Sequence, residues 1–230
     1  MKRTAFALAA AAGLWAGTAA AAPVIWVDWT SGTAGTDGSA TGVIDLGPAG
    51  PDASDISVSY RGEISFIQTT PSTYYYTGNP SPYVSAAVSN APPTSDIIAL
   101  SQASSKTLTF SRPVDNLFFA VVSLNGNGYR FNEDFTIESF APGYWGSGKL
   151  SRQDLGNGSF QLDGSGEPHG VIRFNRAVSS ITWTSLTNEN WNGFTVGTYG
   201  EAPVAAIPAP AALPLFAAGL GLLGWKLRRR

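Results

Sequence analysis

Cysteine is absent from the 230 residues of this chain, and histidine and methionine occur once each. Without cysteine the protein has no disulfide, no thiol nucleophile and no thiolate metal site. The sole histidine, His169, excludes every metal site that needs two imidazoles, and its Gly- and Pro-rich surroundings predict the polar tip of a turn. No nucleophile-elbow glycine pattern accompanies this histidine, so we expect a protein that is not an enzyme.

Amphipathic helical spacing is also missing from the middle of the chain, where hydrophobic residues recur with a period of two. Segments with this alternation are rich in Thr, Val, Ile and aromatic residues, and Gly, Pro, Asn and Asp separate them. The clearest are residues 56–60, 180–184 and 194–199, and residues 117–124 form a nearly continuous apolar run. We interpret that run as a central strand covered on both faces. The pattern predicts an all-β fold, an antiparallel β-sandwich that is jelly-roll-like.

Glycine and asparagine mark two predicted tight turns in this part of the chain. Residues 125–128 read Asn-Gly-Asn-Gly and residues 156–158 read Gly-Asn-Gly. Both patterns supply residues that adopt positive φ angles, and both predict hairpins between adjacent strands. The prolines and tyrosines of residues 68–95 instead predict a long irregular excursion. The tryptophans Trp26, Trp29 and Trp183 lie in predicted strands, which favours positions in the core.

The first 21 residues have the order of a secretory signal peptide. Lys2 and Arg3 precede an apolar stretch, and a run of small residues, Ala19 to Ala22, follows it. This basic start, apolar middle and small-residue cleavage site predict export and removal by signal peptidase, with cleavage after Ala21 or Ala20. Residues 22–203 then form the exported domain.

The C-terminal segment, residues 204–230, has three parts. They are the proline motif Ile207, Pro208, Ala209, Pro210 and Ala211, an apolar run over residues 211–227, and a basic end with Lys226, Arg228, Arg229 and Arg230. As a transmembrane helix, the run would be about 25 Å long, near the lower limit for crossing a bilayer. Because the basic residues follow it, the positive-inside rule predicts a stop-transfer signal with a cytoplasmic C-terminus and a domain that faces outward.

This three-part order resembles the PEP-CTERM family of sorting tails. The closest form is the Val-Pro-Leu-Pro-Ala variant, VPLPA-CTERM, and Ile207 and Ala209 stand where that variant has valine and leucine. The resemblance covers residues 204–230 alone. It implies recognition and cleavage by an exosortase in the inner membrane and a link to exopolysaccharide production, followed by release to the cell surface or exterior. A plain membrane anchor that is never cleaved is the alternative.

Charge separates the exported domain from the two ends. Six of the 14 basic residues belong to the ends, whereas all 16 acidic residues lie in residues 22–203. The domain therefore carries a net charge near −8, from 8 basic and 16 acidic residues. Such a surface disfavours nucleic acid and anionic lipid as partners, and it is compatible with divalent cations or neutral glycans.

Two groups of loop residues are candidate binding sites. Aromatic rings stack on the C–H faces of sugars while carboxylates and amides bind hydroxyl groups, and Tyr144, Trp145, Glu189 and Trp191 offer this mixture. The second group, Asn132, Glu133 and Asp134, offers oxygen ligands of the kind that calcium prefers. A calcium ion that bound only the folded form would stabilise a domain without disulfides.

Three interpretations of function follow. We prefer an exported surface or matrix protein with a structural or adhesive role linked to exopolysaccharide. A carbohydrate-binding module is the alternative. An enzyme acting on polysaccharide is less favoured, because it needs two carboxylates roughly 5–10 Å apart across a cleft. Its candidate carboxylates are Glu133, Asp134, Glu138, Glu167 and Glu189.

Overall fold

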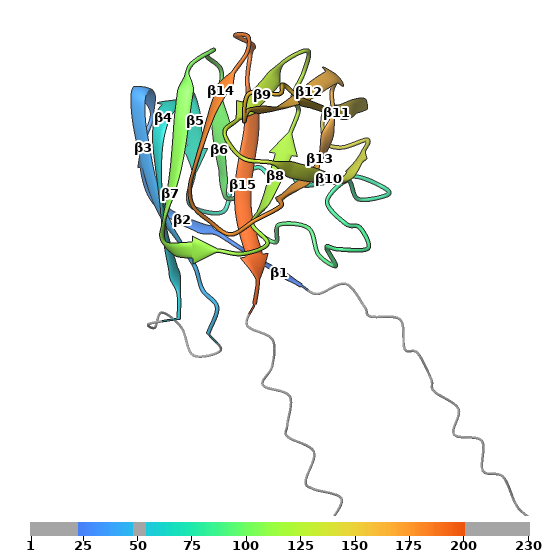
Figure 1. The fold of residues 1–230 in the computed structure, drawn as a ribbon. Helices are drawn as coiled ribbons and strands as arrows, with labels where there is room; N and C mark the ends of the chain where they lie inside the picture. The colour runs from blue at the N-terminus through green and yellow to red at the C-terminus, as the bar shows by residue number, and fades with distance from the viewer. Residues whose placement is uncertain (1–22, 48–53, 201–230) are drawn as a thin grey trace, which may run out of the picture. The chain divides into compact units, whose positions relative to one another are not determined.

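The computed structural model describes residues 23–47 and 54–200. The predicted signal peptide and sorting tail lie outside these residues. The described part is all-β, with two antiparallel sheets that face each other (Figure 1), as the period-two pattern predicts. Within residues 23–47 and 54–200 there is no helix long and apolar enough to cross a membrane.

The first sheet, sheet A, contains seven strands. They are β1 (Val24–Trp26), β5 (Phe66–Gln68), β6 (Ile97–Leu100), β8 (Phe118–Val122), β10 (Phe135–Ala141), β13 (His169–Phe174) and β15 (Asn192–Tyr199). Their order is β10-β13-β8-β15-β6-β5, and β1 also pairs with β15. The central position of β8 between β13 and β15 agrees with the interpretation of residues 117–124 as a central strand.

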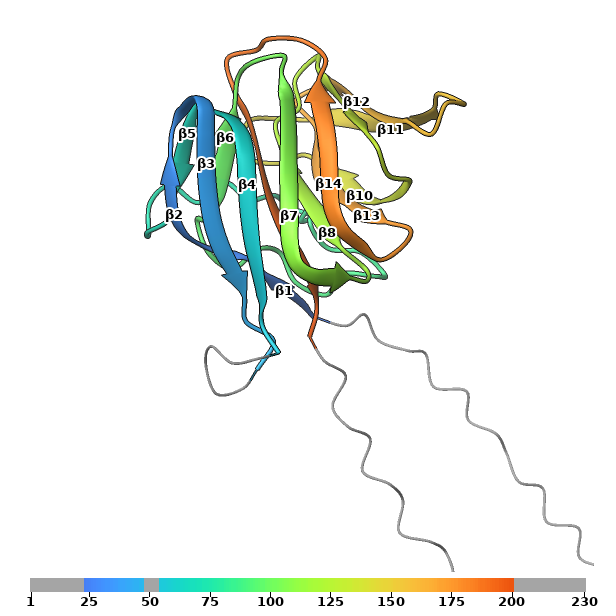
Figure 2. The same cartoon turned by 60° about the vertical axis from the view of Figure 1, so that its left-hand side comes forward.

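The second sheet, sheet B, contains eight strands. They are β2 (Asp28–Thr33), β3 (Gly35–Ile44), β4 (Ile56–Ile64), β7 (Ser105–Val114), β9 (Gly128–Phe131), β11 (Gly148–Asp154), β12 (Phe160–Gly166) and β14 (Val178–Ser185). Their order is β11-β12-β9-β14-β7-β4-β3-β2. Figure 2 shows β3, β4, β7 and β14 of this sheet side by side. From β6 to β11, each successive strand lies in the opposite sheet, so that neighbours in one sheet come from distant parts of the chain.

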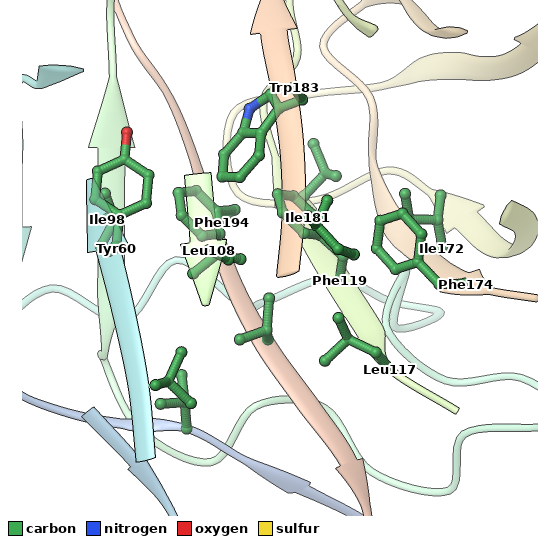
Figure 3. Close-up of a cluster of buried hydrophobic side chains, with 14 of the residues drawn as sticks. Tyr60, Ile98, Leu108, Leu117, Phe119, Ile172, Phe174, Ile181, Trp183 and Phe194 are labelled. Atoms are coloured by element: carbon green, nitrogen blue, oxygen red, sulfur yellow. The ribbon is translucent and has the colours of Figure 1, made fainter. Parts of the chain in front are cut away.

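A large hydrophobic core fills the space between the sheets (Figure 3). Phe119 lies at its centre, stacked on Phe194 at 4.8 Å between ring centroids and edge-on to Trp183 at 5.5 Å. Trp183 and Trp29 are buried, as is Trp26 in a second cluster, which confirms their predicted core positions. Burial of so much apolar surface compensates for the missing disulfides.

The apolar run through β8 is explained by a second layer of packing on sheet A. Phe119 and Val121 point into the core between the sheets, whereas Phe118, Ala120 and Val122 belong to the second cluster. The irregular segment 69–96 covers this outer face, and it contributes Tyr76, Tyr83 and Val88 to that cluster. Because successive side chains of a strand point to opposite faces, a strand buried on both faces needs apolar residues at every position.

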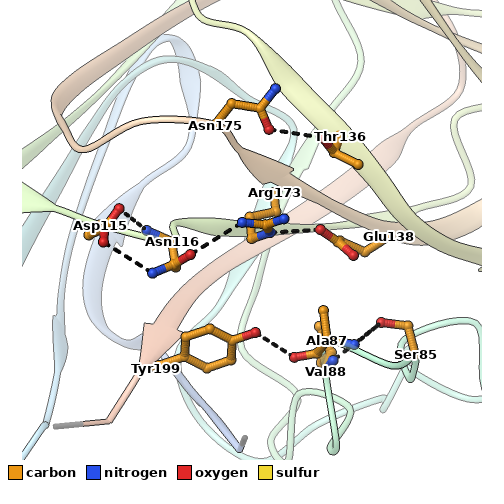
Figure 4. A network of polar contacts seen from close by, with 10 residues as sticks. All are labelled: Ser85, Ala87, Val88, Asp115, Asn116, Thr136, Glu138, Arg173, Asn175 and Tyr199. Carbon is orange, nitrogen blue, oxygen red and sulfur yellow. Dashed lines mark hydrogen bonds and ion pairs between the residues drawn. The ribbon is translucent and has the colours of Figure 1, made fainter. Parts of the chain in front are cut away.

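Polar contacts hold this covering segment and the edge of sheet A in place (Figure 4). The Tyr199 hydroxyl donates to the Ala87 carbonyl oxygen at 2.7 Å and so ties the segment to β15. On β13, Nε of Arg173 donates to Oε1 of Glu138 at 2.7 Å, and Nη1 donates to Oδ1 of Asn116 at 3.3 Å. Arg173 therefore links β13 to β10 through the ion pair, and to the turn before β8 through the hydrogen bond.

Sheet B also buries two charged side chains. Glu63 accepts hydrogen bonds from the backbone amides of Ser101 and Gln102 at 3.0 and 3.2 Å. Nζ of Lys106 donates to the carbonyl oxygens of Gln102 and Ser104 at 2.7 and 2.9 Å. Burial lowers the pKa of Lys106 to about 8, although the nearby Glu63 carboxylate opposes this. These contacts order the connection between β6 and β7.

One of the two predicted hairpins is wrong. Residues 125–128 connect β8 in sheet A to β9 in sheet B, so this turn carries the chain between sheets. The positive φ of 60° expected of glycine is present at Gly126. The other prediction is confirmed, since Gly156 and Gly158, with φ of 73° and 77°, lie in the hairpin between β11 and β12.

The described ends of the domain lie side by side. Val24 on β1 pairs with Tyr199, near the end of β15. The loop before β15 lies at the opposite end of that strand, eight residues away. At about 3.3 Å per residue, the two ends of β15 are roughly 25 Å apart.

Candidate functional site

A cleft of about 260 Å³ lies at the end of the sandwich remote from the described chain ends. We call it the end cleft. It is lined by Ser123, Asn125, Trp145, Glu167, Glu189, Asn190 and Trp191. These residues come from four connections, β8–β9, β10–β11, β12–β13 and β14–β15. The cleft thus brings together three of the four side chains that the sequence suggested for glycan binding, namely Trp145, Glu189 and Trp191.

Tyr144, the fourth, belongs to an aromatic cluster beside the cleft. The cluster consists of Phe66, Tyr75, Tyr144, Trp145 and Trp191. Tyr75 contacts Tyr144 and Trp191 edge-on, each at 5.0 Å between centroids, and Trp145 lies 6.2 Å from Trp191. Trp145 is 52% exposed and Tyr144 43% exposed, which is unusual for such large apolar groups. Their rings are therefore supported from one side and open to a ligand from the other.

The sequence did not single out Phe66 for this cluster, because an apolar residue in a strand has the pattern of a core residue. Its ring lies 5.0 Å from Trp191, also edge-on. Tyr75 carried a weak signal, since it belongs to three consecutive tyrosines in the irregular segment. Only the pairing of β5 with β6 places Phe66 at this end of sheet A.

His169 supports the loop that carries the two exposed rings. The prediction of a polar turn tip is wrong for this residue, because His169 begins β13 and is fully buried. The Trp145 amide donates to Nε2 at 3.5 Å, which leaves the proton on Nδ1 to be donated to the Tyr83 hydroxyl at 3.1 Å. Burial lowers the pKa of His169 to about 4, so the imidazole is neutral at physiological pH.

Close packing against His169 also explains a glycine in this loop. A Cβ atom at Gly143 would lie 2.2 Å from the imidazole ring. The amide of Gly143 donates to the carbonyl oxygen of Gly146 at 2.8 Å and closes the loop. Tyr144 and Trp145 lie between these glycines, so the turn directs both rings outward.

Glu167 is held in the end cleft by neutral donors. The hydroxyl of Ser123 and Nδ2 of Asn125 donate to its two carboxylate oxygens. Ser123 has a φ of 56°, in the left-handed region that residues other than glycine rarely adopt. Such strain costs about 1–2 kcal/mol, and it concentrates at functional sites. Here it directs the hydroxyl toward Glu167.

Glu189 is the second carboxylate of the end cleft, and its donors are also neutral. Nδ2 of Asn127 donates to Oε1 at 2.8 Å, and Nδ2 of Asn192 donates to the same oxygen. Burial raises the pKa of Glu189, and the charge of Glu167 raises it further, while these amide contacts oppose the shift. The pair therefore holds negative charge close together without a basic partner among the lining residues.

The calcium candidates lie in the turn between β9 and β10, away from the end cleft. Asp134 accepts from Nε of Arg152 at 3.0 Å, and Glu133 pairs with Arg176. Burial disfavours ionisation of Asp134, but the contacts with Arg152 prevail and lower its pKa. Oδ1 of Asn132 accepts a hydrogen bond from the backbone amide of Thr182. Each carboxylate thus has a guanidinium partner, and across residues 23–47 and 54–200 no cluster of three His, Cys, Asp or Glu could hold a metal ion.

Comparisons with protein-family models, curated proteins and solved structures give no significant match for this chain. Two features of the chain bear on its function, the chemistry of the end cleft and the sequence of the two chain ends. That chemistry is an array of exposed aromatic rings next to two hydrogen-bonded carboxylates.

Proposed function

We propose that this protein is an exported component of the cell surface or extracellular matrix whose β-sandwich binds polysaccharide through the end cleft. The observation that carries the proposal is the convergence of Trp145, Trp191 and Glu189 in one cleft, with Tyr144 beside it. This combines the adhesive role expected from the tail with the glycan-binding role expected from the loop aromatics. No catalytic step is part of the proposal.

Sugar chemistry matches the residues of the cleft. A pyranose ring presents apolar C–H faces that pack on an aromatic ring and equatorial hydroxyl groups that need hydrogen-bond partners. Trp145 offers an exposed ring face, and Asn190, Glu167 and Glu189 offer acceptors and donors around it. The exposed Tyr144 extends the aromatic surface beyond the cleft.

The position of the cleft fits a domain held by its C-terminus. Residue 200 follows β15 at one end of the sandwich, whereas Trp191 precedes the same strand at the other end. An anchor joined at residue 200 would thus be attached to the end of the sandwich opposite the cleft. In this proposal, signal peptidase removes residues 1–21, the helix over 211–227 holds the protein in the inner membrane with its domain outward, and an exosortase cleaves at residues 207–211.

We also interpret the strand order as jelly-roll-like. Sheet A contains the order β6-β15-β8-β13 and sheet B the order β7-β14-β9-β12, and from β6 to β15 the chain crosses between the sheets at most steps. Jelly rolls occur among lectin domains, which is an analogy of fold and not an argument about the site. The argument for glycan binding rests on the cleft.

The first experiment is affinity electrophoresis of the protein in gels that contain neutral, amino-sugar or acidic polysaccharides. We expect retardation in at least one gel, and we expect the Trp145→Ala variant to lose it because the exposed stacking ring is gone. Phe140→Ala is the matched control, since Phe140 is 45% exposed but does not line the cleft. Equal retardation of both variants, or none for the unmodified protein, contradicts the proposed site.

Routing is tested by the intact mass of the protein recovered from its own cells in separate fractions. We expect the mass of a chain that begins after residue 21 and ends within residues 207–211. This chain should occur in a fraction other than the inner membrane. Replacement of Pro208 and Pro210 by alanine should retain the protein in the membrane fraction. A mass that extends through Arg230 in the unmodified protein contradicts processing and leaves a plain membrane anchor.

A second candidate function is cleavage of the bound polysaccharide, which the presence of Glu167 and Glu189 in one cleft favours. The raised pKa of Glu189 suits a general acid, with Glu167 as the second carboxylate of the pair. Release of reducing ends that stops in the Glu189→Gln variant would support this function. Binding without release would leave the protein as a binding module.

A further inference from the structure

The carboxylates of the end cleft differ from the three carboxylates of the described residues that form ion pairs. Glu133, Asp134 and Glu138 each form an ion pair with an arginine. Glu167 and Glu189 instead accept hydrogen bonds from hydroxyl and amide groups only. No lysine, arginine or histidine is among the residues that line the end cleft. Two negative charges therefore lie in one partly enclosed site without a protein cation to neutralise them.

This arrangement has an energetic consequence for the ligand. Like charges that share a site disfavour each other's ionisation, and Glu189 responds in this direction. A cation between the carboxylates would relieve the repulsion, whereas a ligand carboxylate would increase it. Trp145 meets Trp191 edge-on at 6.2 Å between centroids and is 52% exposed, so its open ring surface adds a second attraction for a cation through the ring quadrupole.

We propose that the end cleft selects a cationic amino sugar, that is, a polysaccharide in which hexosamine units carry free amines. The sugar ring stacks on Trp145, and its protonated amine lies between Glu167 and Glu189. A neutral glucan gains only the stacking, and a uronic acid polymer is repelled by the two carboxylates. This inference rests on the proposed function, since it names the substrate class of the same cleft.

The test uses four soluble hexamers of equal length, of which one is cationic, two are neutral and one is acidic. They consist of β-1,4-linked glucosamine, its N-acetylated counterpart, β-1,4-linked glucose, and galacturonic acid. Because Trp145 and Trp191 line the cleft, tryptophan fluorescence reports binding directly. We expect the glucosamine hexamer to bind at least about tenfold more tightly than the N-acetylated one slightly below neutral pH, where its amines are protonated.

The variants Glu167→Gln and Glu189→Gln remove one charge each with almost no change of shape. We expect each to reduce the preference for the free amine several-fold, and the double variant to abolish it while binding of the glucose hexamer is retained. Asp115→Asn is the charge-matched control, because Asp115 is exposed and precedes β8 at the end remote from the cleft. It should leave the preference unchanged.

The outcomes separate this inference from the proposed function. If all neutral and cationic hexamers bind equally well, or if the preference survives in the double variant, amine selection is wrong and glycan binding stands. If no hexamer or polymer binds, the proposed function fails as well. Binding that appears only when calcium is added, and to hexamers without amines, would place a metal ion between the carboxylates and overturn the inference.

Discussion

Lowering the pH from 7 to 4 tests the burial of His169 and with it the support of the cleft loop. The pKa is about 4 in the folded protein and about 6.5 in an unfolded chain. Between these values the unfolded chain binds a proton that the folded protein does not, so the free energy of unfolding decreases as the pH falls. At about 1.4 kcal/mol for each pH unit, the loss reaches about 3 kcal/mol at pH 4.

The free energy of unfolding decreases at low pH because protonation of His169 would place a charge in a fully buried position. Its two neighbours, the Trp145 amide and the Tyr83 hydroxyl, are neutral, and burial raises the pKa of Tyr83 well above its usual value, so that this hydroxyl does not titrate in the same range. No stabilising counter-charge is therefore supplied by either contact.

Urea denaturation, followed by tryptophan fluorescence at several pH values, measures this effect in the unmodified protein and in His169→Gln. Glutamine keeps an acceptor for the Trp145 amide but does not titrate, so the difference between the two profiles isolates the histidine from the carboxylates. Because the chain has one histidine, its NMR signal also reports the pKa without ambiguity. Parallel profiles between pH 6.5 and 4, or a native pKa near 6.5, would refute the reasoning.

Three further perturbations test the core and the loop. Phe119→Ala should lower the free energy of unfolding by about 3–5 kcal/mol in urea denaturation, because it opens a cavity between the sheets, whereas the exposed Phe140→Ala should change it by less than about 1 kcal/mol. Glu63→Gln should cost about 2 kcal/mol in the same assay, since it weakens the hydrogen bonds that the Ser101 and Gln102 backbone amides donate to a buried carboxylate. Gly143→Ala should displace the cleft loop from His169 and weaken glycan binding, while the thermal midpoint of the domain changes little.

Opposite results would identify the fault in each case. A small effect of Phe119→Ala would mean that neighbouring rings collapse into the space. A neutral Glu63→Gln would mean that its partners are satisfied by water instead. Unchanged glycan binding in Gly143→Ala would show that the loop adopts its position without the close approach to His169.

Much of the fold is predictable because its signals are local. Alternation of apolar and polar residues depends on the two-residue repeat of a strand, so residues 56–60, 180–184 and 194–199 were recognisable as strands. Residues 117–124 lacked this alternation, which correctly indicated burial on both faces. The hairpin at residues 156–158 followed from glycine at positions with positive φ, whereas the same chemistry at residues 125–128 could not reveal that the chain passes to the other sheet.

The candidate site divides in the same way. Sequence alone determined which side chains have the chemistry to bind sugar, and it identified Tyr144, Trp145, Glu189 and Trp191 because stacking rings and hydrogen-bonding groups are properties of residue types. The predictions for the two chain ends also come from sequence alone, because a signal peptide and a sorting tail are defined by contiguous residues. Tertiary structure alone decided that residues 20 to 70 positions apart meet in one cleft, that Glu167 joins them, and that His169 lies beneath their loop. These contacts result from strand pairing. Which strands pair depends on packing across the whole domain, and a local sequence pattern does not contain that information.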